Sequence, residues 1–458
     1  MTRPQRLVLI IAILASFVAF LDSSVINVAL PAMSADLGGG LSTQQWVVDA
    51  YLITLSSLML LAGSFSDVFG RIVVLRVGLI AFGAASLLIA LSPSAEFLIV
   101  MRGVQGIAGA LLVPSSLALI ISTFRHAEQG KAIGLWTAWT SAAFLAGPIL
   151  GGLFVDYLSW RWVFVINVLP IVAALVLLVM LGQKDARKAG VSIDYVGAVL
   201  GAVGLGGPVF ALIEQGNYGW GSPAIVLPFG IGILSLIAFI LWERRAKHPM
   251  LPLGIFGVRN FAWGNVSTVF VYAALSLGGF IIVVFLQQVA GFPATLAALA
   301  LLPISLGNIL LSGLFGTLAG KHGPRLFMTL GPIVGGIGFL WFLTMGNEVN
   351  YWWNVLPGVV IFAVGLSITV APLTAAILGS IPSAQAGIGS ATNNAVSRVA
   401  GLISTAMIGV IVAGTLDVEG FHRVIVVTAA LLVLGGVVSF AGIRNPDNSQ
   451  PVTSPPAI

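Results

Sequence analysis

The sequence GSFSDVFGR at residues 63–71 returns late in the chain as GTLAGKHGPR at residues 316–325. In both copies two glycines stand seven residues apart, at Gly63 and Gly70 and at Gly316 and Gly323, and a basic residue closes the motif. Each copy joins the second and third apolar runs of its half of the chain. A repeat of this kind indicates two structurally similar halves that run in the same direction.

The amino-acid composition shows whether those halves lie in water or in a lipid bilayer. Hydrophobic residues make up 58% of the 458 residues and charged residues only 8%, with a mean hydropathy of +1.08. Soluble domains carry roughly 25% charged residues, so this chain is not a soluble protein. Apolar runs long enough to cross a bilayer as helices recur along it. We predict fourteen spans, at residues 7–29, 45–63, 72–92, 97–120, 132–154, 162–181, 194–213, 223–242, 262–287, 294–316, 326–344, 354–379, 396–415 and 423–443.

Two polar links, 182–193 and 243–261, set apart a central pair of spans. Without that pair, six spans remain on each side, which is the transporter pattern with a substrate site near the midplane. The fold class is therefore an all-α integral membrane protein with two six-helix bundles and two extra helices. The predicted units are a first bundle (1–181), a linker with the extra helices (182–261), a second bundle (262–443) and a disordered tail (444–458). Glu214 in the extra pair is expected near the outer surface and dispensable.

The positions of Lys and Arg predict the orientation. With the N-terminus inside, almost all basic residues fall in inner segments, and the outer ends hold only Arg161 and Arg423. This asymmetry predicts a multi-pass protein of the cell membrane with both termini in the cytoplasm. It also explains the net charge of +5 without nucleic acid as a partner.

Several chemistries are excluded by missing residues. Cysteine is absent, so there is no thiolate metal site and no cysteine nucleophile. No phosphate-binding GKS or GKT sequence occurs, and no HExxH zinc motif occurs. The sequence therefore predicts neither an enzyme nor any bound cofactor or metal.

Charged residues inside the predicted spans are the candidate functional groups. Asp22, Asp49 and Arg102 fall within apolar runs, where an ionisable side chain is costly. A carboxyl group that moves between apolar surroundings and a nearby arginine can take up and release a proton. Gln105 lies on the same helix face as Arg102, and Asn27 lies close to Asp22 in sequence. The alternative is a fixed Asp–Arg pair that only holds helices together.

Five motifs in order resemble the major facilitator superfamily, and specifically its fourteen-span drug:proton antiporter branch. They are residues 21–31 (LDSSVINVALP), 63–71 (GSFSDVFGR), 102–106 (RGVQG), 147–152 (GPILGG) and 160–167 (WRWVFVIN). The resemblance covers the whole chain. It implies a proton-linked role for Arg102 and Gln105 and an antiporter role for the helix that carries Gly147, Pro148, Gly151 and Gly152, which could seal one side against the other half.

The resemblance also implies a conformational latch at Gly63, Asp67, Gly70 and Arg71. Two departures bear on it. Val68 and Ile72 stand where family loops usually carry basic residues, and Gly320 stands where the first copy has Asp67. Any charge latch is therefore expected to be asymmetric and simpler than usual.

These observations together predict a monomeric, proton-coupled multidrug efflux antiporter that works by alternating access. Its partners are small hydrophobic or cationic substrates, protons and the bilayer. Asp22 and Asp49 are expected to bind proton and substrate, and Arg102 is expected to tune the pKa of these carboxyl groups. The alternatives are an exporter of a lipid, an endogenous metabolite or a self-made antibiotic on the same fold, and a non-transporting membrane sensor. Whether Asp49 protonates in the cycle stays open.

Overall fold

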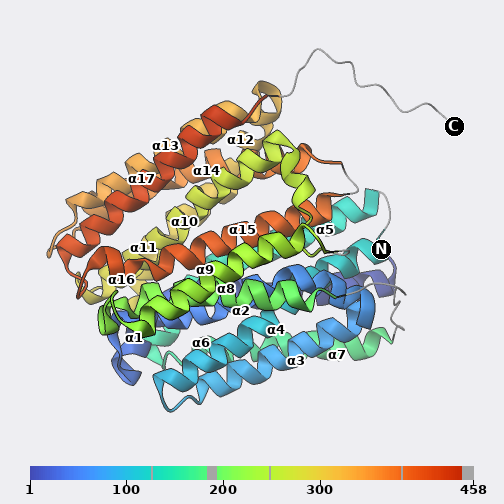
Figure 1. Ribbon diagram of the computed structural model, residues 1–458, viewed down its shortest axis with the longest axis horizontal. Coiled ribbons are helices and arrows are strands. Elements are labelled where there is room, and N and C mark those ends of the chain that lie inside the picture. The colour runs from blue at the N-terminus through green and yellow to red at the C-terminus, as the bar shows by residue number, and fades with distance from the viewer. Residues whose placement is uncertain (125–126, 183–192, 247–248, 383–384, 446–458) are drawn as a thin grey trace.

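The computed structural model describes residues 1–124, 127–182, 193–246, 249–382 and 385–445, and the side chains of residues 60, 63, 64, 67, 127, 386 and 387 lie outside this description. The described part is helical, without a strand (Figure 1). The α-helices are α1 (Arg3–Leu37), α2 (Gly40–Phe69), α3 (Arg71–Ala90), α4 (Ala95–Thr123), α5 (Ala127–Tyr157), α6 (Trp162–Val165), α7 (Val168–Leu181), α8 (Tyr195–Tyr218), α9 (Pro223–Glu243), α10 (Arg259–Gln288), α11 (Ala294–Ala300), α12 (Leu302–His322), α13 (Pro324–Trp341), α14 (Leu356–Gly379), α15 (Ala386–Ala406), α16 (Ile408–Val412) and α17 (Val418–Gly442).

The predicted all-α membrane fold is confirmed. Within the described residues, thirteen helical segments are long and apolar enough to cross a bilayer. The remaining predicted span, 45–63, falls in the 30-residue helix α2, part of which lies outside the description. Apolar side chains project outward along the bundle, as they do from Leu169 in α7 and Leu310 in α12. The chain is therefore a multi-pass membrane protein.

One predicted span is misplaced. The span expected at 396–415 corresponds to α15 and α16, and α15 begins ten residues earlier, at Ala386. The early part of α15 holds Asn393, Asn394 and Ser397, whose polarity hides the helix from an apolar-run criterion. This difference places Arg398 about three turns inside the helix rather than at its edge.

The internal repeat has a structural basis in two tight turns. Gly70 separates α2 from α3 with φ +97°, and Gly323 separates α12 from α13 with φ +87°. Residues with a side chain avoid this left-handed backbone region, so glycine is needed at both turns. The repeated motif thus encodes the same reversal of direction in each half.

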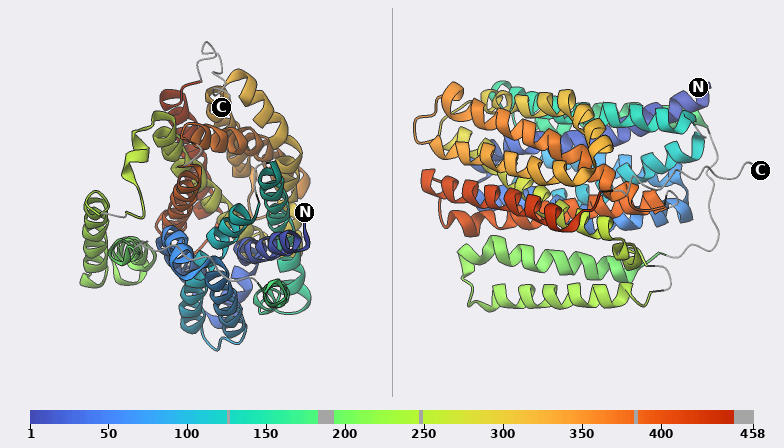
Figure 2. Two further views of the ribbon diagram at one scale, coloured as in Figure 1. Left: turned by 90° about the vertical axis from the view of Figure 1, so that its right-hand side faces the viewer. Right: turned by 90° about the horizontal axis from the view of Figure 1, so that it is seen from above.

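The extra helices α8 and α9 stand at one side of the molecule (Figure 2). Helix α8 packs against α2 and also against α15 and α16. Val209 and Ile213 of α8 form an apolar cluster with Leu402 and Ala406 of α15. The pair therefore lies along the line where helices of the first and second halves meet, while most of α9 faces outward.

The two halves are joined at the end of the bundle opposite the chain termini, here called the far end. Gln45 Nε2 donates to the carbonyl of Thr405 at 2.7 Å, and Gln287 Nε2 donates to the carbonyl of Val28 at 3.1 Å. Asp156 accepts from the backbone amides at the start of α11 at 3.0 and 2.7 Å. A large apolar cluster with residues from both halves surrounds these bonds. Hydrogen bonds between the halves thus gather at the far end in the described structure.

Candidate functional site

A buried ion pair forms the centre of the site. Arg102 Nη1 of α4 lies 2.7 Å from Asp22 Oδ2 of α1, and the two side chains are 1% and 0% exposed. Gln105 Nε2 donates to Asp22 Oδ1 at 3.0 Å, and Arg102 Nη1 donates to Gln105 Oε1 at 2.6 Å. The spacing of three residues between Arg102 and Gln105 puts both on one face of α4 and lets both reach Asp22.

Three further segments complete this network. These are two helices, α3 and α2, and the junction of α6 and α7, where Asn167 donates from Nδ2 to Asp22 Oδ1 at 3.0 Å. Ser86 of α3 accepts from Gln105 Nε2 at 2.9 Å. Arg102 Nε donates to the carbonyl of Val47 in α2 at 2.9 Å. The carboxylate of Asp22 therefore contacts α4 and the junction of α6 and α7 directly, and it reaches α2 and α3 through Arg102 and Gln105.

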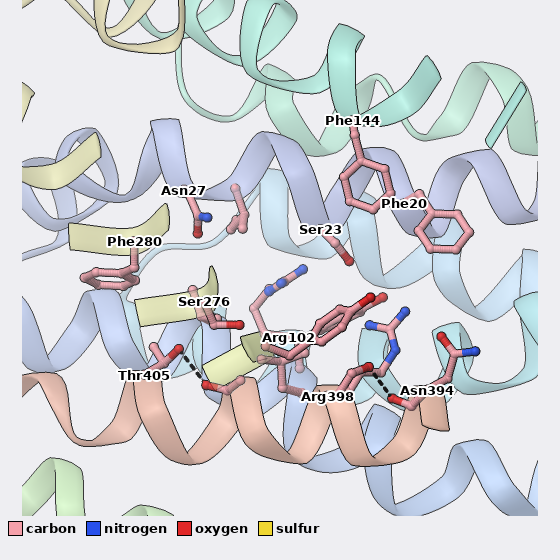
Figure 3. Close-up of a pocket in the computed structure, with 17 residues that line it drawn as sticks. Phe20, Ser23, Asn27, Arg102, Phe144, Ser276, Phe280, Asn394, Arg398 and Thr405 are labelled. Carbon is pink, nitrogen blue, oxygen red and sulfur yellow. Dashed lines mark hydrogen bonds between the residues drawn. The ribbon is translucent and has the colours of Figure 1, made fainter. Parts of the chain in front are cut away.

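A cavity of about 390 Å³ lies beside the network, between the two halves (Figure 3). Helices α1, α2, α4 and α5 line it from the first half, and α10 and α15 line it from the second half. Its lining residues are Phe20, Ser23, Ile26, Asn27, Val48, Tyr51, Leu52, Arg102, Phe144, Tyr272, Ser276, Phe280, Asn394, Ser397, Arg398, Gly401 and Thr405.

Arg102 belongs to both the network and the cavity. Its guanidinium carbon lies 4.4 Å from the centre of the Tyr51 ring, which also lines the cavity. A cation over an aromatic face is stabilised by the ring's negative charge density. Asp22 does not line the cavity and lies behind Arg102. A ligand in the cavity would therefore sense Asp22 through Arg102.

The other predicted coupling residues separate into two locations. Asn27 lines the cavity, so Asp22 and Asn27 point to different surroundings, in keeping with their spacing on α1. Asp49 is completely buried in α2 outside the network, and neither of its carboxyl oxygens has a hydrogen-bonding partner among the described residues. The structure thus brings together Asp22, Arg102 and Gln105 but not Asp49.

The predicted latch is described only in part. The side chains of Gly63 and Asp67 lie outside the described residues. Gly70 forms the turn between α2 and α3, and Arg71 begins α3 next to it.

The glycines of residues 147–152 make close contacts with two different partners. A Cβ atom at Gly147 would meet the side chain of Ser24, and one at Gly151 would lie 2.7 Å from Val25 Cγ2, both in α1. A Cβ atom at Gly152 would lie 2.6 Å from the Cα of Thr295 in α11. Of these glycines, Gly152 faces the other half, whereas Gly147 and Gly151 bring α5 close to α1. Pro148 lies inside α5 between them.

Sequence reasoning missed three members of the site. Ser86 and Asn167 are single polar residues inside the predicted spans 72–92 and 162–181. Asn167 closes the motif at residues 160–167, but only contacts with the Asp22 network assign the two residues to the site. Arg398 lines the cavity from the second half. Its signal was present, since it is a charged residue inside a span, but the predicted boundary at 396 placed it at a helix edge.

Comparisons with known proteins agree with this architecture. The sequence profile of the Major Facilitator Superfamily matches residues 12–405. The chain is 32% identical to the puromycin resistance protein pur8 of Streptomyces alboniger, over 89% of this chain and 81% of that protein. It is 34% identical to the methylenomycin A resistance protein of Bacillus subtilis, over 88% and 87% of the two chains. It is 32% identical to the multidrug resistance protein Stp of Mycobacterium tuberculosis, over 91% and 78%.

Solved structures share the fold at low sequence identity. The crystal structure of peptide transporter POT in complex with sulfate aligns with a TM-score of 0.69 and 16% identity, over 96% of this chain and 94% of that one. A D-xylose-proton symporter aligns with a TM-score of 0.67 and 15% identity, over 96% and 98%. The chain belongs to the Major Facilitator Superfamily. It is therefore a transporter that moves small molecules across a membrane, and not an enzyme.

Proposed function

We propose that this protein is a proton-coupled efflux antiporter that exports hydrophobic small molecules, including drugs, across the plasma membrane. The names of its relatives, which are resistance and export proteins for unrelated antibiotics, support drug efflux. The abundance of Lys and Arg in the segments on the side of the termini supports cytoplasmic termini. In that orientation the far end faces outward and is closed, and the cavity belongs to an inward-open state of a monomer.

The observation that carries proton coupling is the double role of Arg102. It is paired with Asp22 on one side and lines the cavity on the other. Protonation of Asp22 removes the counter-charge of a buried arginine, which costs several kcal/mol if the arginine stays in place. Arg102 then has to find another partner, and the hydrogen bonds to Gln105 and Asn167 rearrange with it. Protonation of Asp22 thus changes the cavity lining through Arg102, without direct contact between Asp22 and substrate.

The remaining sequence-based roles enter the same scheme. The first and second six-helix bundles, 1–181 and 262–443, rock about the cavity, and the extra pair spans the line between them. Asp67, Arg71 and their glycines form the latch on the cytoplasmic side. Gly152 and Asp156 make the outer contact with α11. Export of a self-made antibiotic fits the same site, since relatives include a tetracenomycin C resistance and export protein and a cephamycin export protein.

The test is export from cells that lack their own pumps. Three probes share a pyrenebutyl body and differ in the end group, which is a carboxylate, a hydroxyl or a trimethylammonium. We expect energised cells with the wild-type protein to accumulate less of at least one probe than cells without it. An uncoupler and the Asp22→Asn variant should each abolish this difference. Undiminished export by Asp22→Asn, at equal expression, would exclude Asp22 from coupling.

A further inference from the structure

The charges that line the cavity are all of one sign. Of the seventeen lining residues only Arg102 and Arg398 carry a full charge, and neither an aspartate nor a glutamate is among them. Asp22 and Asp49 are wholly buried in the protein and do not reach the cavity surface. Among the lining residues a bound ligand therefore meets Arg398 and the buried, Asp22-paired Arg102, and no acidic side chain.

The two arginines differ in their partners. Asp22 neutralises Arg102 at 2.7 Å. Arg398 makes no hydrogen bond or ion pair with any described residue, and its Nε atom is buried without an acceptor. A buried N–H donor without an acceptor is costly in a low-dielectric setting. Among the residues that the structure describes, Arg398 is thus a charged group without a hydrogen-bonding or ionic partner.

The remaining lining residues indicate the chemistry of the part of the ligand that does not contact the arginines. Phe20, Phe144 and Phe280 contribute aromatic surface around the cavity, Asn394 adds a polar group beside Arg398, and Ser276 adds another elsewhere on the lining (Figure 3). A guanidinium presents several N–H groups in a planar fork that matches a carboxylate with two parallel hydrogen bonds. The lining is therefore complementary to an apolar body that carries one anionic group.

From this arrangement we infer that the transported compounds are amphiphilic anions, each with an apolar body and a carboxylate that binds Arg398. The inference rests on the proposed export function and names its substrate class. A cation, the cargo expected from the sequence, would approach Arg398 with no acidic residue to balance it.

Equilibrium binding to the purified full-length protein in lipid nanodiscs tests the inference without any transport. The probes are pyrenebutyrate, pyrenebutanol and the pyrenebutyl-trimethylammonium cation, and the readout is their fluorescence. We expect the wild-type protein to bind the anion more tightly than the cation. Arg398→Gln should weaken binding of the anion by about tenfold or more, because it removes a hydrogen-bonding charge. Arg398→Lys should retain most of the preference for the anion.

Two controls separate a local effect from misfolding. Pyrenebutanol carries no charge, so its unchanged affinity in Arg398→Gln shows that the cavity is intact. Arg76→Gln removes an exposed cation outside the cavity and should leave all three affinities unchanged. The inference is overturned if the wild-type protein prefers the cation, if it binds none of the probes, or if Arg398→Gln binds the anion within twofold of wild type.

The two proposals fail in different ways. Export of the cation or the alcohol, sensitive to an uncoupler and to Asp22→Asn, would preserve the antiporter and overturn the anionic substrate class. Binding of pyrenebutyrate through Arg398 without export of any probe would preserve the binding site and count against proton-driven efflux.

Discussion

Arg102 Nη1 lies 2.7 Å from Asp22 Oδ2, and this ion pair joins α4 to α1 with both side chains buried. The same guanidinium forms part of the cavity wall. A proton on Asp22 therefore changes the electrostatic surroundings of a ligand that Asp22 never touches. This relationship is the physical basis for coupling in the scheme above.

Substitutions of Asp22 and Arg102 should have strongly non-additive effects on the stability of the protein. Arg102→Gln leaves the carboxylate of Asp22 buried without its cation, and Asp22→Asn leaves the guanidinium without its anion. Each single change should cost about 3–5 kcal/mol of stability. The double variant should lose less than the sum of the two, as measured by thermal unfolding in nanodiscs. Additive losses would show that the two groups act independently.

Asp49 should behave differently from Asp22. Its carboxyl group is buried and has no hydrogen-bonding partner among the described residues, so a charge there is much more unfavourable than a neutral group. We expect Asp49→Asn to leave the melting temperature unchanged or higher, whereas Asp22→Asn lowers it. A large drop for Asp49→Asn would reveal a charged partner. Proton-driven export by Asp49→Asn in the pyrene assay then reports whether Asp49 takes part in the cycle.

Gly152 should control closure of the far end. A larger side chain there would collide with the backbone of Thr295 in α11. Gly152→Leu should open this contact and increase labelling of a cysteine introduced at Ala298, which is buried next to it. The chain has no native cysteine, so a membrane-impermeant maleimide reports this position alone.

Gly134 provides the matched control for that experiment, because it lies in the same helix and a Cβ atom there meets nothing within 4 Å. Gly134→Leu should leave labelling at Ala298 unchanged. Equal labelling in the Gly152→Leu and Gly134→Leu backgrounds would show that Gly152 does not hold the far end closed.

Glu214 should tolerate loss of its charge but not of its oxygen atoms. Glu214 Oε1 accepts from Trp46 Nε1 at 2.7 Å, which ties the extra helix α8 to α2 near the far end. Glu214→Gln keeps this acceptor, so export should match the wild type. Glu214→Ala leaves the indole N–H of Trp46 unpaired and should cost about 1–3 kcal/mol in thermal unfolding. Loss of export in Glu214→Gln would instead assign the charge a role in transport.

The sequence by itself determined the membrane fold, the repeated halves and the importance of Asp22 and Arg102 as charges within apolar runs. Apolar runs of span length have few alternatives in a bilayer, because every backbone N–H and C=O must be paired within a helix. The two turns have positive φ values at Gly70 and Gly323, and other residues avoid this region, so glycine at these positions marks the turns in the sequence. Asp22 and Arg102 stand out for a similar reason, since charges are rare in such runs.

Only the tertiary structure decided which charges meet and which face the cavity. Asp22 and Asp49 look alike in sequence, yet Asp22 is paired with Arg102 and Asp49 has no hydrogen-bonding partner among the described residues. Arg398 looks like a residue at a helix edge, and its position three turns inside α15 places it on the cavity wall. The difference arises because hydropathy reports how deep a residue lies, while the packing of helices distant in sequence sets the direction in which its side chain points.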